Sequence, residues 1–209
     1  MPTSPGGPLI HALHALWAHI QKAVPDLPPV RIAITSALSP PGHGPERWQE
    51  DEDGVVTGLV ITASTLREGA DATSHEVLHH AAHLLNWRRN VADTAARGAY
   101  HNARFLDAAA ELGLALPAGA KRTTRGFADV EMTPETHARY AADVAKLAAV
   151  IPGALPHLEP PPSAPRARGD RITLRCGCEP KPRAIKVGAT VAALGPIVCG
   201  VCKKEFLAD

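Results

Sequence analysis

The segment from His75 to Trp87, HEVLHHAAHLLNW, contains the residue types that bind a catalytic metal. His75 and His79 are four positions apart, and Glu76 directly follows the first histidine. An α-helix turns by about 100° per residue, so the two imidazoles would share one face and reach a single ion. The spacing predicts a catalytic zinc site with His75 and His79 as ligands.

A glutamate at this position has a specific chemical use. A catalytic zinc keeps one coordination position for water and lowers the pKa of that water to about 7. Glu76 is therefore the predicted general base, which takes the water proton and passes it to the leaving amine. H-E-x-x-H also arises by chance in a chain with eleven histidines, and the alternative is a surface helix that merely carries them.

Elements on both sides of the motif favour the zinc interpretation. The β-branched run at 58–64 predicts a strand, and Asp71, Thr73 and Ser74 are N-cap candidates just before His75. A strand, a short loop and the motif helix are expected in that order. The apolar residues of the helix would hold it against a core: Val77, Leu78, Ala81, Ala82, Leu84 and Leu85.

Other histidines of this helix are expected to have different roles. His83 lies about 12 Å along the axis from His75, too far for both to share an ion. We expect His83, and His80 on a neighbouring face, to be hydrogen-bonded or surface side chains. Ala82 and Leu85 stand where the longer metzincin motif needs Gly and His, which disfavours that class.

The third ligand must come from another segment. His101 lies on the approach to an apolar-periodic helix, and a ligand from a second packed helix would complete three protein ligands plus water. Asp93 and Glu111 are alternatives, since carboxylates also bind zinc. Tyr100 or Tyr140 could donate to the tetrahedral oxyanion, although packing is the commoner role of either.

The run from His75 to Leu114 resembles the SprT-like zinc metallopeptidases, particularly bacterial and phage members. The matching residues are His75, Glu76 and His79, then Asp93 and Thr94, Tyr100 to Phe105, and Glu111 to Leu114. The resemblance implies an α+β zincin-like domain, in which a small sheet packs on the helices that carry H-E-x-x-H. It implies His101 as the third zinc ligand and a protein substrate bound or crosslinked to DNA. The spacing from His79 to His101 exceeds that of the shortest members, so a loop should bulge between the helices.

All four cysteines fall near the end of the chain, as the pairs Cys176/Cys178 and Cys199/Cys202. Two close pairs joined by strand-like sequence are typical of a zinc ribbon, in which four thiolates hold a structural zinc. Disulfides are disfavoured because Met1 to Ile10 does not have the pattern of a secretory signal, and a cytoplasmic location, which we expect, keeps thiols reduced. SprT-like proteins often carry such a ribbon after the peptidase domain.

Composition predicts four segments. We expect a disordered N-terminus at 1–8, a peptidase domain at 9–150, a proline-rich linker at 151–170 and a zinc ribbon at 171–209. No stretch approaches the roughly twenty apolar residues of a membrane helix, so no membrane partner is expected.

Charge is unevenly distributed along the chain. Residues 166–209 have nine Lys or Arg against four Asp or Glu, a net charge of +5, and residues 1–165 have a net charge of −4. A basic ribbon favours contact with the phosphates of DNA, although an ordinary solvated surface has the same composition. The sequence thus predicts a zinc metalloendopeptidase with one catalytic and one structural zinc, acting on protein, with DNA-bound protein as a candidate substrate. The alternative is a non-catalytic zinc-ribbon adaptor that binds DNA and uses a zincin-like domain as a scaffold.

Overall fold

The computed structural model describes residues 6–36, 44–158 and 171–208. The chain divides into two compact units, Met1–Pro160 and Pro161–Asp209, and each is described by itself. The first unit mixes helices and strands, as the predicted α+β class requires. Among the described helices, none combines the length and apolar character that crossing a bilayer requires.

The first unit contains a three-stranded sheet and five α-helices within its described residues. In chain order its elements are α1 (Gly7–Ala23), β1 (Val30–Thr35), η1 (Pro45–Arg47), β2 (Gln49–Glu50), β3 (Val56–Thr62), α2 (Ala63–Glu68), α3 (Ala70–Arg88), β4 (Thr94–Ala95), β5 (Tyr100–His101), α4 (Ala103–Glu111), β6 (Leu114–Ala115), β7 (Glu131–Met132) and α5 (Pro134–Leu158). The sheet order is β1-β3-β2, with β1 parallel and β2 antiparallel to the central β3. Two short antiparallel pairs, β4 with β5 and β6 with β7, lie outside this sheet.

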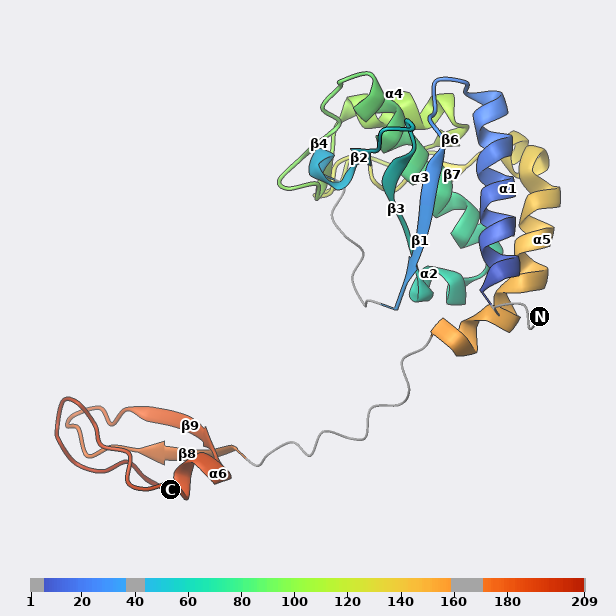
Figure 1. Ribbon diagram of the computed structural model, residues 1–209. Coiled ribbons are helices and arrows are strands. Elements are labelled where there is room, and N and C mark those ends of the chain that lie inside the picture. The colour runs from blue at the N-terminus through green and yellow to red at the C-terminus, as the bar shows by residue number, and fades with distance from the viewer. Residues whose placement is uncertain (1–5, 37–43, 159–170, 209) are drawn as a thin grey trace. The chain divides into compact units, whose positions relative to one another are not determined.

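Helix α3 is the central element of the first unit. It contacts α1, α2, α4, α5 and β3, while α1 and α5 pack side by side (Figure 1). The apolar residues predicted to face the core, such as Val77 and Leu84, are fully buried. Because neighbours surround the helix, its polar residues His80, His83 and Asn86 are buried as well and need partners inside the protein.

The approach to α3 differs from the predicted strand, loop and helix. The short helix α2 stands between β3 and α3, and the Thr62 side chain caps it by accepting a hydrogen bond from the Thr65 backbone N–H at 3.1 Å. The chain then turns at Gly69, whose φ of 108° suits glycine, and α3 begins at Ala70. The predicted N-cap residues 71, 73 and 74 therefore lie inside the helix.

The ends of the first unit also differ from the predicted boundaries. Helix α1 begins at Gly7, and residues 1–5 of the predicted disordered N-terminus lie outside the described residues. Helix α5 extends to Leu158, into the predicted linker, although it contains Pro152 and Pro156. Both prolines are exposed, so water can satisfy the carbonyls they leave free, and the buried Ile151 and Ala154 hold this last part against the core. Residues 159–170 of the linker lie outside the described residues.

The second unit is a small sheet built around the cysteines. Its elements are β8 (Arg171–Arg175), β9 (Ala184–Gly188), α6 (Ala189–Ala192) and β10 (Leu207–Ala208). The sheet order is β10-β8-β9, and both pairings are antiparallel. Its buried core contains only Leu174, Cys176, Cys199 and Phe206 among the described residues. A core this small cannot stabilise a fold alone, which agrees with a module held by metal.

Candidate metal centre

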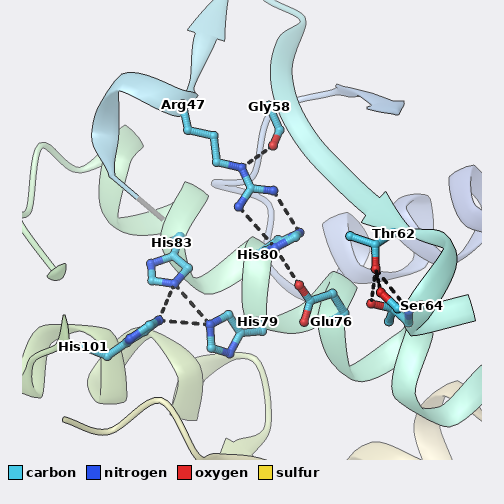
Figure 2. A network of polar contacts seen from close by, with 10 residues as sticks. Arg47, Gly58, Thr62, Ser64, Glu76, His79, His80, His83 and His101 are labelled. Atoms are coloured by element: carbon cyan, nitrogen blue, oxygen red, sulfur yellow. Dashed lines mark hydrogen bonds and ion pairs between the residues drawn. The ribbon is translucent and has the colours of Figure 1, made fainter. Parts of the chain in front are cut away.

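Three buried imidazoles converge in the first unit: His79 and His83 of α3, and His101 of β5 (Figure 2). The Nε2 atoms of His79 and His101 are 3.1 Å apart, those of His83 and His79 are 3.2 Å apart, and those of His83 and His101 are 3.0 Å apart. These three residues form the histidine triad. His79 and His83 meet because they are one helical turn apart.

His101 is brought to the helix by backbone contacts on both sides. It pairs with Thr94 in the β4–β5 hairpin, its N–H donates to the Arg125 carbonyl at 3.0 Å, and its carbonyl accepts the Phe127 N–H at 3.0 Å. Gly126 lies against this backbone with φ +75°, and a Cβ at that position would be 1.9 Å from the His101 carbonyl oxygen. Gly126 is thus required for the close approach that positions His101.

Asp93 orients His83. Its Oδ2 lies 2.8 Å from Nδ1 of His83, and Asn86 donates to the same oxygen at 3.3 Å. Because a carboxylate can only accept, Nδ1 of His83 carries the proton and Nε2 presents its lone pair to the other two rings. A carboxylate behind a histidine is a common arrangement around protein-bound zinc. Asp93, predicted as an alternative ligand, contacts a candidate ligand instead.

The spacing of the histidine triad suits a metal ion such as zinc. Burial lowers the pKa of His101 to about 4, with a further contribution from His83, so its ring is neutral near pH 7. Nitrogen ligands at 2.0–2.1 Å in tetrahedral geometry are roughly 3.3–3.4 Å apart. The observed 3.0–3.2 Å separations lie close to that value. Three imidazoles also match the ligand set of known catalytic zinc sites.

A pocket of about 390 Å³, the triad pocket, borders two members of the histidine triad, and His75 also lines it. His79 and His101 form part of its wall, together with the carboxylate residues Glu76, Asp129 and Glu131. Arg125 also lines it and forms an ion pair with Asp129. The pocket wall therefore joins imidazoles that could hold a metal ion, three carboxylates and a guanidinium.

The structure does not bring His75 into the histidine triad, so the predicted pairing of His75 with His79 needs correction. Nε2 of His75 lies 2.8 Å from the Val130 carbonyl, and its ring centroid is 6.1 Å from that of His79. The first i, i+4 pair of histidines is not the converging pair, because His79 and His83 have the same spacing and lie nearer to His101. The interval from His83 to His101 is four residues shorter than the interval from His79 to His101, and it contains the β4–β5 hairpin.

With His79 in place of His75 as the first histidine of the pair, the residue that directly follows it also changes. In H-E-x-x-H that residue is the glutamate, but the residue after His79 is His80. Glu76 lies one turn before His80, and its Oε1 is 3.0 Å from Nε2 of that ring. The predicted base is thus beside the pocket, but in contact with a second imidazole.

The remaining predicted residues lie away from the pocket wall. Glu111 forms a surface ion pair with Arg89 at 2.7 Å. Tyr140 of α5 is buried, with its ring 4.9 Å from that of His19 in α1, and Tyr100 does not line the pocket. Arg125 is the cationic side chain that does, and the sequence contains no motif that would have identified it.

The four cysteines of the second unit form one cluster, with all Sγ atoms within 4.8 Å of one another. Cys178 and Cys199 are 3.8 Å apart at sulfur, close to the roughly 3.8 Å expected between thiolates bound tetrahedrally at 2.3 Å. All four are free cysteines rather than disulfides. The cluster can bind a metal ion, as predicted for the ribbon.

Backbone N–H groups stabilise the thiolate form in this cluster. Hydrogen bonds from the N–H groups of Cys202 and Val201 lower the pKa of Cys199 to about 6. The Arg183 N–H donates to Cys176 Sγ at 3.3 Å, and such backbone bonds lower the pKa of that thiol against the opposing effect of burial. A thiolate is the metal-binding form, so these backbone contacts favour metal at Cys176 and Cys199, whereas the neighbouring Cys176 thiol and burial raise the pKa of Cys178.

The surface of the second unit is basic and partly apolar. Within residues 171–208 there are seven Lys or Arg and two Glu. Exposed aliphatic side chains also occur there, notably Leu194 at 87% and Val201 at 61% exposure.

Comparisons with family models, with curated proteins and with solved structures find no match to this chain.

Proposed function

We propose that this chain is a zinc metallopeptidase of the SprT-like type, with the catalytic zinc held by the histidine triad and a structural zinc held by the four cysteines. The observation that carries the proposal is a cluster of three buried imidazoles, of which His79 and His101 line a pocket that also contains Glu76. Bound zinc would polarise a carbonyl and lower the pKa of a water molecule to about 7.

The residues around the pocket have distinct parts in peptide hydrolysis. Asp93 holds the His83 tautomer that presents a lone pair inward. Glu76 accepts a proton from the attacking water and returns it to the amine that leaves. Arg125 lies where a cation can stabilise negative charge that develops on the carbonyl oxygen.

The substrate part of the proposal rests on the resemblance and on charge. The SprT-like resemblance implies protein bound or crosslinked to DNA, and the net charge of the second unit suits contact with phosphate. The described part of the second unit offers no helix longer than the four residues of α6, so reading of base sequence is not part of the proposal.

Glu76→Gln tests the chemistry. The variant should keep about two zinc ions per chain but lose cleavage of a DNA-coated basic protein by 10²–10⁴-fold, roughly the usual contribution of a general base. Glu111→Gln, outside the pocket, is the matched control and should cleave normally. Cleavage measured with and without single-stranded DNA tests whether nucleic acid contributes.

One observation favours the alternative, a DNA-binding adaptor whose first unit is a metal-held scaffold. His80 stands where H-E-x-x-H has its glutamate, and a scaffold needs no base there. The adaptor would bind two zinc ions and DNA, and parent and Glu76→Gln proteins would both leave the protein substrate intact.

A further inference from the structure

A chain of polar contacts runs beside the histidine triad, from the backbone of β3 through Arg47 and His80 to Glu76 (Figure 2). Arg47, at the end of η1, donates from Nε to the Gly58 carbonyl. Its terminal nitrogens lie 3.2 and 3.3 Å from the two ring nitrogens of His80. Nε2 of His80 in turn lies 3.0 Å from Oε1 of Glu76.

The donor and acceptor roles in this chain of contacts can be assigned. Because the Glu76 carboxylate accepts, Nε2 of His80 donates, and its Nδ1 is then the acceptor for the Nη2–H of Arg47. In this tautomer the 3.2 Å contact of Arg47 Nη1 with Nε2 is not a hydrogen bond, because both atoms carry protons. Each group thus orients the next, starting from a carbonyl in the sheet. Burial lowers the pKa of Arg47 to about 10, against the raising effect of Glu76, so the guanidinium stays charged near pH 7 and balances the carboxylate.

The position of Glu76 and His80 on α3 indicates what the chain of contacts does. His79 and His83 are one turn apart, and Glu76 and His80 form a second pair, also one turn apart, directly beside them (Figure 2). His80 holds the position next to the first ligand, and the carboxylate of Glu76 extends to that ring. The Glu76 side chain is 24% exposed and lines the triad pocket, whereas the His80 side chain is fully buried.

We propose that Arg47 and His80 are positioning residues that hold the Glu76 carboxylate at the wall of the triad pocket, where it acts as the base. This inference rests on the proposed function. Without the two partners, the glutamate side chain would sample several rotamers, and a misplacement near 1 Å can lower a rate by about 10²-fold. A glutamate at position 80 would directly follow the first ligand and would need no such partners. Here Arg47 and His80 place the carboxylate of Glu76 instead.

Arg47→Met is the main test, because methionine keeps much of the apolar stem and removes the charge and all donors. It should keep two zinc ions per chain and the parent KM, while kcat falls by about 10–100-fold. Arg31→Met is the matched control: Arg31 also forms an ion pair, with Asp51 at 2.6 Å, on the exposed surface. The control should keep the parent kcat.

A binding measurement supplies a readout that does not depend on turnover. Acetohydroxamate chelates zinc in active sites and offers protons to a neighbouring carboxylate. Its affinity for the zinc-loaded chain, measured by calorimetry, should fall by about tenfold in Glu76→Gln and by a similar factor in Arg47→Met. The double variant should lose no more than either single variant, because both changes remove one positioned carboxylate.

The outcomes separate this inference from the proposed function. If the parent cleaves nothing but the hydroxamate shows this non-additive pattern, the peptidase proposal fails and the positioning role stands. If Arg47→Met is folded and zinc-loaded but keeps the parent kcat and hydroxamate affinity, the positioning role is refuted. Should Arg47→Met lose its zinc or its fold, Arg47→Lys decides: the positioning role predicts about a fivefold lower kcat, and a parent value overturns it.

Discussion

Replacing His83 with alanine tests the metal centre most directly, because the sequence motif and the structure disagree about this residue. The motif assigns His75 and His79 to the zinc, whereas the structure brings His83 to His79 and leaves Nε2 of His75 on the Val130 carbonyl. His83→Ala should therefore release the catalytic zinc, and His75→Ala should retain it.

The size of the effect depends on the number of ligands. Four-ligand zinc sites bind with about 10–16 kcal/mol, or roughly 2.5–4 kcal/mol for each ligand. Since 1.4 kcal/mol is a factor of ten, His83→Ala should weaken zinc binding by roughly 10²–10³-fold. Asp93→Asn, which removes the charge behind His83 at 2.8 Å, should weaken it by about 10–100-fold.

Competition with a chelator of known zinc affinity measures these changes. The parent chain and His75→Ala should hold about two zinc ions at a chelator concentration where His83→Ala holds one, in the cysteine cluster. Truncating a buried ring also leaves a cavity, so His80→Ala on the same helix is the control for lost packing. It should keep both zinc ions despite a lower melting temperature.

The opposite pattern would refute the structural assignment. If His75→Ala loses the first-unit zinc while His83→Ala keeps it, the ligand pair is the one that the motif suggests. Equal retention by both variants would mean that the first unit binds no zinc through α3.

Three further predictions concern the surroundings of the two sites. Gly126→Ala should weaken binding of the catalytic zinc by about tenfold in the same competition assay, because its Cβ would meet the His101 carbonyl at 1.9 Å; an unchanged affinity would show that the loop adapts. Cys199→Ser should remove the structural zinc and the dispersed NMR resonances of the second unit while the first unit keeps its own, since so small a core depends on metal. Asp143→Asn should lower the melting temperature by about 2–4 °C, near 1 kcal/mol, because it weakens the 2.8 Å contact to His19 that joins α1 to α5; calorimetry showing no shift would contradict this.

Local patterns in the sequence determined much of the fold. The strand predicted from the β-branched run at 58–64 largely coincides with β3, and the apolar face predicted for the motif helix is buried. Thr133 has the residue type of a helix cap before Pro134, and its hydroxyl accepts the Thr136 N–H at 3.3 Å. These features depend on neighbours in the chain, so residue type and spacing are enough to predict them.

Histidine and cysteine content also predicted which residue types could hold metal. The cysteine pairs form one cluster and His101 joins His79, as expected from their spacing and from the resemblance. The cysteines are the clearer case, because the chain has only four and they stand in two close pairs.

Only the tertiary structure decided which histidines of α3 converge. The helix contains two pairs with the same spacing, and helical geometry alone does not distinguish them. The position of His101, set by the loop around Gly126 and by the β4–β5 hairpin, selects His79 and His83. Packing on all sides of α3 likewise turned His80 into a buried partner of Arg47, a contact across 33 positions that no local pattern encodes.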